Sequence, residues 1–95
     1  MTNHATSQFW KLFARLPDNI QDIARKQFDL FEQDINYPSL QFKQLSGTRN
    51  EIWSARINDT YRVLALHVKD AQKQDVWIWF WIGTHREYEK AVGRL

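Results

Sequence analysis

The apolar run at residues 76–82 (VWIWFWI) restricts the possible folds of this chain more than any other stretch. A strand that is apolar on both faces needs neighbours or cover on both sides, so this run is predicted to be a central or doubly covered strand. It is far shorter than the roughly 20 apolar residues that cross a bilayer as a helix. We therefore expect a sheet built around this run, and no contact with a membrane.

Three further stretches are predicted to be strands. Residues 40–45 (LQFKQL) alternate apolar and polar side chains, as an edge strand does. Residues 51–57 (EIWSARI) and 61–68 (YRVLALHV) are rich in residue types that favour strands. Because short links join these stretches, the sheet should be antiparallel. Residues 1–7 are expected to be either loose or a short edge strand.

Apolar residues at helical spacing predict two helices before the sheet. Ser7 can cap the first helix, which should end at Pro17 because the residue before a proline avoids the α region. Asp18 or Asn19 can cap the second helix, whose single apolar side suits it to cover a sheet. The link is so short that the two helices should form a helical hairpin. The two apolar stripes are Phe9, Leu12, Phe13 and Leu16, and then Ile20, Ile23, Ala24, Phe28, Phe31 and Ile35.

A third helix is predicted at the end of the chain. Gly83 should end the apolar strand, and Thr84 should cap the helix. Glu87 follows Thr84 at the spacing of a capping box, in which each residue bonds the backbone N–H of the other. The expected fold class is α+β: an N-terminal helical hairpin packed on an antiparallel sheet of about four strands, followed by a C-terminal helix.

The composition limits which kinds of protein this chain can be. The 95 residues are expected to form one domain, residues 1–95, and 43% hydrophobic and 15% aromatic content is enough for a folded core. The absence of cysteine excludes disulfides and cysteine-based zinc sites. Residues 1–10 contain no apolar run typical of a signal peptide, so we expect a cytoplasmic protein. A net charge of +2 permits a nucleic acid or an acidic protein as partner without selecting either.

The link after Ile57 decides which face of the sheet Arg62 occupies. A two-residue turn would place Arg62 opposite Ala55, among apolar side chains. A three-residue link at 58–60 pairs Arg56 with Arg62 instead and leaves the apolar side chains together on the other face. Because a shift of one residue flips every side chain and an unpaired buried arginine is strongly destabilising, the three-residue link is predicted.

This register places Arg56 and Arg62 side by side on the face away from the helices. Like charges opposite each other in a sheet lower its stability, and a chain that keeps such a pair often uses it to hold an anion. The alternative is that each arginine pairs with a carboxylate, for example Glu51 or Glu87. Composition alone leaves both interpretations open.

The segments around the two arginines follow a recognisable order. They are WSARINDTYRVL at 53–64, then a loop, then an apolar strand that ends in IGTHREY at 82–88. Before them stand LPDNIQDIARKQFDLFEQD at 16–34 and YPSLQFKQL at 37–45. In this order and spacing the chain resembles the RelE/ParE superfamily of bacterial type II toxins over roughly residues 9–95.

The resemblance to RelE-like members implies cleavage of mRNA on the ribosome, by attack of a 2′-OH on the neighbouring phosphate without metal or cofactor. Such cleavage needs a base for the 2′-OH, cations for the phosphate and an acid for the 5′-oxygen. By position, Arg62 would stabilise the phosphate, His85 would be catalytic, and Tyr88 would stack on a base or transfer a proton. The candidate residues for binding RNA phosphates are Arg56, Lys43 and Arg86.

The resemblance also implies partners and alternatives. The partners would be a cognate antitoxin protein in a hetero-oligomer, mRNA and the ribosome. ParE-like members instead block DNA gyrase, and a third option is an inactive binding module of the same fold. Ser54 and Thr84 stand where RelE-like members have basic residues. Each candidate also has a structural interpretation: His85 as a first-turn polar residue, Tyr88 as a core residue of the last helix, and Lys43 as a solvated strand residue.

Overall fold

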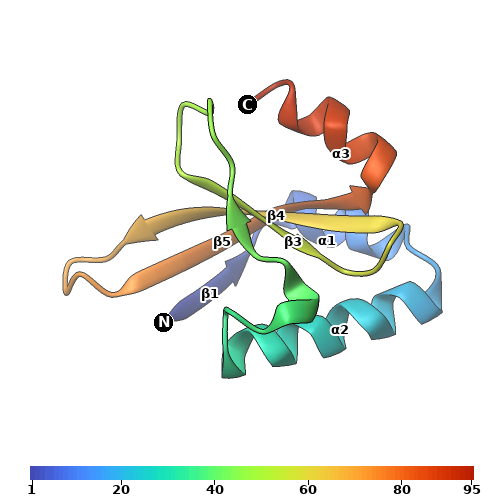
Figure 1. The fold of residues 1–95 in the computed structure, drawn as a ribbon, viewed down its shortest axis with the longest axis horizontal. Coiled ribbons are helices and arrows are strands. Elements are labelled where there is room, and N and C mark those ends of the chain that lie inside the picture. The colour runs from blue at the N-terminus through green and yellow to red at the C-terminus, as the bar shows by residue number, and fades with distance from the viewer.

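The computed structural model describes residues 1–95 and contains one sheet of five strands in the order β1-β5-β4-β3-β2 (Figure 1). The strands are β1 (Thr2–Ala5), β2 (Lys43–Gln44), β3 (Ile52–Arg56), β4 (Tyr61–Lys69) and β5 (Asp75–Thr84). All neighbours are antiparallel except β1 and β5, which are parallel. The α+β fold class is confirmed. The sheet exceeds the predicted four strands because the N-terminal segment forms an edge strand, one of its two expected states.

The apolar run lies inside the sheet, as predicted, with β4 on one side of β5 and β1 on the other. Gly83 does not end this strand: it pairs with Arg62 of β4, and β5 continues to Thr84. A Cβ atom on Gly83 would lie 2.8 Å from a ring carbon of Trp81. The predicted strand break is therefore wrong, because this glycine makes room for a side chain rather than for a turn.

The hairpin of β3 and β4 has the predicted register. Arg56 pairs with Arg62 and Ala55 pairs with Val63 across the link at 58–60. The face toward the helices belongs to the hydrophobic core or packs against it, as predicted. Its residues on these two strands and the link are Trp53, Ala55, Ile57, Tyr61, Val63 and Ala65.

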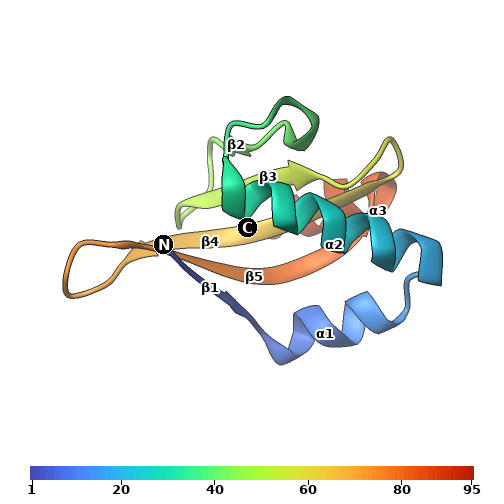
Figure 2. The same cartoon turned by 90° about the horizontal axis from the view of Figure 1, so that it is seen from below.

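Two helices, α1 (Ser7–Ala14) and α2 (Asp18–Gln33), follow β1. Seen from below, α2 runs across the sheet and α1 lies on the side of β1 and β5 (Figure 2). Thr6 rather than Ser7 caps α1, and its Oγ1 accepts a hydrogen bond from the Phe9 N–H at 3.1 Å. Pro17 occupies the N-cap of α2, so Asp18 supplies first-turn negative charge instead of the predicted cap.

The core between α2 and the sheet is largely aromatic. Phe31 is 1% exposed and meets Phe42, Trp77 and Trp79 edge-on, with ring centroids 4.9, 5.8 and 5.1 Å from its own. Edge-to-face contacts of this kind add to the stabilisation that burial of the rings provides. A small core is thus strengthened by large side chains, as the composition indicated.

The predicted edge strand at 40–45 is mostly wrong. A 3₁₀ helix, η1 (Pro38–Leu40), occupies its start, and Gln41 follows with a left-handed φ of 45°. Only Lys43–Gln44 pairs with β3. Leu40 is 1% exposed and Phe42 packs on the core. Leu40 and Phe42 therefore reach the core from a 3₁₀ turn and the residues just after it, not from an extended strand.

The last helix, α3 (His85–Val92), follows β5 directly and lies on the opposite side of the sheet from α2 (Figure 1). The predicted capping box is present: Thr84 Oγ1 accepts from the Glu87 N–H at 3.1 Å, and Glu87 Oε1 accepts from the Thr84 N–H at 3.0 Å. No residue of α3 is fully buried, so its apolar side is only partly covered. None of the helices combines the length and hydropathy that a membrane span requires.

Candidate functional site

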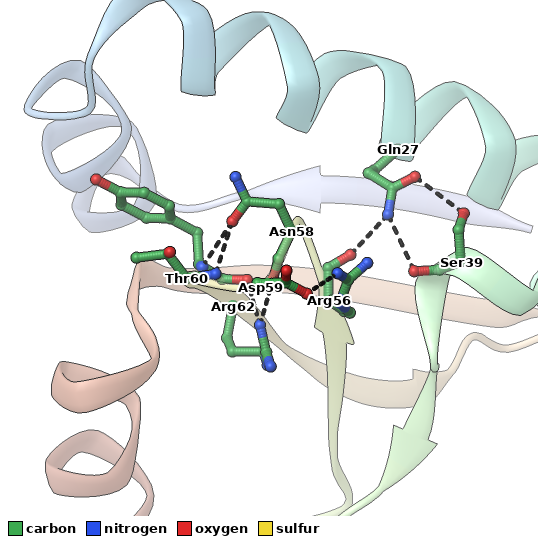
Figure 3. A network of polar contacts seen from close by, with 8 residues as sticks. Gln27, Ser39, Arg56, Asn58, Asp59, Thr60 and Arg62 are labelled. Atoms are coloured by element: carbon green, nitrogen blue, oxygen red, sulfur yellow. Dashed lines mark hydrogen bonds and ion pairs between the residues drawn. The ribbon is translucent and has the colours of Figure 1, made fainter.

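The link at 58–60 shapes the end of the sheet where the arginines stand. Asn58 Oδ1 accepts hydrogen bonds from the backbone N–H groups of Thr60 at 2.9 Å and Tyr61 at 3.0 Å (Figure 3). Asparagine often fixes a turn in this way, since its side chain substitutes for a backbone acceptor. The backbone carbonyls of the link therefore have defined directions.

Arg62 is held by these carbonyls. Its Nη1 donates to the backbone oxygens of Asn58 at 2.5 Å and Tyr61 at 2.9 Å (Figure 3). No carboxylate forms an ion pair with it. Arginine also donates from Nε and Nη2, so these N–H groups remain available to an anion. For Arg62, the anion interpretation fits the geometry and the carboxylate interpretation does not.

Arg56 does pair with a carboxylate, but the partner is Asp59 rather than Glu51 or Glu87 (Figure 3). The Asp59 side chain is 95% exposed and the Arg56 side chain 26% exposed. Exposed ion pairs contribute little free energy, because water and salt screen them. A phosphate that approaches Arg56 can therefore replace Asp59 at small cost.

Gln27 of α2 supports Arg56 from the other side of the strand. Its Nε2 donates to the backbone oxygens of Arg56 at 2.8 Å and Ser39 at 3.2 Å, and the Ser39 hydroxyl donates to its Oε1 at 3.2 Å (Figure 3). Gln27 is buried, while Phe28, which was predicted to face the sheet, is 37% exposed. Phe28 still contacts the sheet, since its ring meets Trp79 of β5 edge-on with centroids 6.3 Å apart. Gln27 lies outside the predicted apolar stripe and is buried because an amide whose hydrogen bonds are satisfied can be buried at little cost.

His85 and Tyr88 lie in the first half of α3, next to the link. The His85 backbone N–H donates to the Thr60 carbonyl at 2.5 Å, which ties the start of α3 to the link that holds Arg62. The His85 ring stacks on Tyr88, with centroids 5.7 Å apart and planes 18° from parallel. The His85 side chain is 51% exposed, and its Nε2 lies 3.5 Å from Glu89 Oε1. The structure thus brings Arg62, His85 and Tyr88 to one end of the sheet.

Two further residues, Lys43 and Arg86, were predicted to bind RNA phosphates. Lys43 pairs with Ser54, two residues before Arg56, so Lys43 occupies the same face as Arg56. Arg86 is exposed at the start of α3 and forms no ion pair. Ser54 is 4% exposed and Leu64 is fully buried. The face away from α2 is therefore open near the arginines but covered at Ser54 and Leu64.

The carboxylates predicted as alternative partners of the arginines are engaged elsewhere. Backbone and side-chain hydrogen bonds from Thr84 lower the pKa of Glu87 below its ordinary value. A hydrogen bond from Trp53, assisted by His67, lowers the pKa of Glu51. Both groups are ionised at neutral pH, yet neither touches Arg56 or Arg62. Of the two arginines, only Arg56 is paired with a carboxylate, and that carboxylate is Asp59.

Sequence reasoning missed three residues that shape this site. Asn58 and Asp59 were treated only as parts of a link, although an Asn-Asp pair is a strong signal for a side-chain-capped turn. Gln27 had no usable signal, because its burial depends on carbonyl groups from η1 and β3 that only the folded chain brings together.

A hollow of about 430 Å³ lies between α1, α2 and the sheet, and Gln27 and Arg56 are part of its lining. Its lining is mostly apolar, and it contains neither Arg62, His85 nor Tyr88. The predicted catalytic residues therefore lie outside this hollow, near the 58–60 link.

Comparison with known proteins identifies the family. A model of the ParE-like toxin domain matches residues 18–90, which includes α2, the strands β2 to β5 and most of α3. The chain belongs to the ParE-like toxin family. The predicted membership of the RelE/ParE superfamily is thereby confirmed. A search of curated protein sequences finds no match.

Solved structures share the fold of this toxin domain. The RelE–RelB complex of Pyrococcus horikoshii OT3 matches with a TM-score of 0.65 and 19% identity, over 87% of this chain and 92% of that one. The YoeB/ParE toxin of Agrobacterium tumefaciens matches with a TM-score of 0.69 and 14% identity, over 90% and 99%. The RelB–RelE antitoxin–toxin complex of Methanococcus jannaschii matches with a TM-score of 0.60 and 15% identity, over 93% and 96%.

Proposed function

We propose that this toxin domain is an endoribonuclease that cleaves mRNA without a metal or cofactor and so inhibits translation. The observation that carries the proposal is the placement of Arg62 and His85 at one end of the sheet, tied together through the hydrogen bond between His85 and Thr60. A phosphate bound there would meet free arginine N–H groups and an exposed imidazole. These are the cation and the proton carrier that RNA cleavage requires.

In the proposed reaction the ribose 2′-oxygen attacks the adjacent phosphorus, and the bond from phosphorus to the 5′-oxygen breaks. A base takes the 2′-OH proton and an acid protonates the leaving oxygen, so the products carry a 2′,3′-cyclic phosphate and a 5′-OH. Arg62 stabilises the charge that develops on the phosphate, and His85 transfers one of the two protons. Tyr88 stacks on a base or transfers the other. Neighbouring phosphates contact Arg56, Lys43 and Arg86.

The proposal includes a partner and a compartment. Among the structures of the same fold are complexes of RelE with RelB, one of them described as an antitoxin–toxin complex. We propose that a cognate antitoxin likewise binds and neutralises this toxin, and that its target is mRNA on the ribosome in the cytoplasm.

A gyrase-blocking activity is the second candidate function, favoured by the match to the ParE-like family model. It needs no phosphate-cleaving residues. It therefore predicts that Arg62 and His85 can be replaced without loss of toxicity, and that expression triggers DNA-damage signalling.

Regulated expression in a bacterial host tests the proposal. Wild-type protein should arrest growth without inducing a DNA-damage reporter, and Arg62→Ala should abolish the arrest. Lys26→Ala is the matched control, because Lys26 is an exposed cation of α2 without an ion pair. Undiminished arrest by Arg62→Ala, at equal protein level, would overturn the nuclease assignment.

A further inference from the structure

A second hollow, also of about 430 Å³, lies between α1, α3 and the outer edge of β5. β1 pairs with β5 only as far as Trp79, so beyond that residue the edge of β5 has no strand neighbour. Arg15 at the end of α1, Lys90 of α3 and Arg94 beyond it line this hollow, together with Glu87. We call it the basic hollow.

Positive charge dominates the basic hollow. Arg15, Lys90 and Arg94 form no ion pairs. Glu87 is the only carboxylate in the lining, and its Oε1 already accepts hydrogen bonds from the N–H and O–H of Thr84 at 3.0 and 2.9 Å. Since cations of one sign gathered around a concave surface attract anions, the hollow is suited to a negatively charged ligand.

An aromatic ring completes the hollow. Trp81 is part of its lining and only half-buried, and its ring passes so close to Gly83 that no Cβ would fit between them. The Trp81 and Tyr88 ring centroids are 6.3 Å apart. Gly83 is the strand partner of Arg62. The basic hollow therefore adjoins the end of the sheet where we place RNA cleavage.

We propose that the basic hollow is a second contact site for single-stranded RNA, which holds phosphates on Arg15, Lys90 and Arg94 and one base on Trp81. This inference rests on the proposed function, because the strand that is cut beside Arg62 continues into the hollow. A positively charged groove combined with an aromatic stacking surface is the usual means of binding single strands without sequence preference.

The salt dependence of RNA binding tests the phosphate contacts. The ligand is a short fluorescent single-stranded RNA with methylated 2′-oxygens, which the toxin cannot cut. Arg15→Gln/Lys90→Gln should lower the slope of log affinity against log salt by about 1.4, since each single-strand phosphate contact contributes about 0.7. The matched control Lys11→Gln/Lys26→Gln removes the same charge from exposed helix positions outside the hollow and should keep the slope of the wild type.

Two results decide this test. Equal slopes for the two double variants would overturn the phosphate contacts. The variant Arg15→Lys/Lys90→Arg keeps the charge and should restore the slope of the wild type, which distinguishes a lost contact from a disturbed fold. A reduced slope in this variant as well would also count against the proposal.

A second pair of variants tests the base contact. Trp81→Leu should weaken binding about tenfold at fixed salt, because stacking on an aromatic ring contributes roughly that much per base. Trp10→Leu, which changes a 54% exposed tryptophan outside the basic hollow, should have little effect. Unchanged affinity of Trp81→Leu would overturn the base contact.

Failure of this inference can be told apart from failure of the proposed function. If Arg62→Ala abolishes cleavage of unmethylated RNA but Arg15→Gln/Lys90→Gln binds with the slope of the wild type, the basic hollow is not an RNA site and the nuclease assignment stands. If the wild-type protein does not bind single-stranded RNA and its expression produces no new mRNA ends in cells, both are wrong.

Discussion

Two surfaces of the sheet differ in character. The surface beneath α2 is buried and aromatic, whereas the opposite surface, at the 58–60 link, presents polar groups without protein partners. Beneath α2, Phe31 and Trp77 are 1% and 3% exposed and meet edge-on, so this surface supplies cohesion. At the link, Arg62 keeps N–H groups without a protein partner and His85 is half exposed. One strand register produces both surfaces, so a slip of one residue would destroy the core and bury the arginines together.

Gln27 connects the two surfaces. It belongs to the helix that covers the core, and it bonds the backbone oxygen of Arg56, whose side chain lies on the opposite face. The contrast therefore predicts three kinds of variant: those that lower stability alone, those that affect the proposed chemistry alone, and those at contact points that affect both.

Phe31→Ala should have the largest effect on stability. Removing a ring that contacts several aromatic neighbours leaves a cavity, and such changes cost about 3–5 kcal/mol. Urea unfolding followed by tryptophan fluorescence measures the change. A loss below about 1 kcal/mol would mean that the surface beneath α2 does not provide the cohesion we assign to it.

Gln27→Ala should lower stability by about 1–3 kcal/mol, because the carbonyl groups of Arg56 and Ser39 lose their donor. It should also weaken toxicity, since the support behind Arg56 is lost. Gln33→Ala, at the exposed end of the same helix, is the control for helix propensity. If both glutamine variants behave alike, Gln27 does not connect the two surfaces.

Thr84→Ala should cost about 1 kcal/mol, the usual value for an N-cap. The capping box would lose its hydroxyl, and the first turn of α3, which carries His85, would become less ordered. Thr84→Ser keeps the hydroxyl and should restore both thermal stability and toxicity. Full toxicity of Thr84→Ala would show that the placement of His85 is not critical.

Protonation of Glu87 in acid should weaken the fold less than any of these substitutions. Hydrogen bonds from Thr84 lower the pKa of Glu87 in the folded protein below its ordinary value of 4.5. A carboxyl with a lowered folded pKa stabilises the protein above its unfolded pKa, and this stabilisation is lost as pH falls through the folded pKa. Urea unfolding from pH 6 down to about pH 3 should show this loss, and Glu87→Gln should reduce its slope, since glutamine keeps the capping box without titrating.

The β3–β4 register could be predicted from sequence because one physical rule decided it: an unpaired arginine is not buried among apolar residues. The capping box of Thr84 and Glu87 depends only on local spacing and was equally predictable. Both features involve residues close together in the chain. The prediction that Arg56 and Arg62 share a face likewise depended only on residues close together in the chain.

The features that could not be predicted depend on distant partners. β1 pairs with β5 in parallel across most of the chain, and no pattern within residues 1–7 specifies that neighbour. The alternation at 40–45 resembles a strand, yet the core takes Leu40 from a 3₁₀ turn. For the candidate site, Arg62 was placed correctly, but its hydrogen bonds to the link and the pairing of Arg56 with Asp59 depend on side-chain conformations that spacing does not determine.

Sequencing of mRNA 5′ ends after brief expression tests most directly whether the end of the sheet at Arg62 cuts RNA. The wild type and the control Lys26→Ala should produce new ends that carry a 5′-OH within coding regions, whereas Arg62→Ala at equal protein level should produce none. New ends that persist in Arg62→Ala, or growth arrest by the wild type with no new ends, would contradict the account.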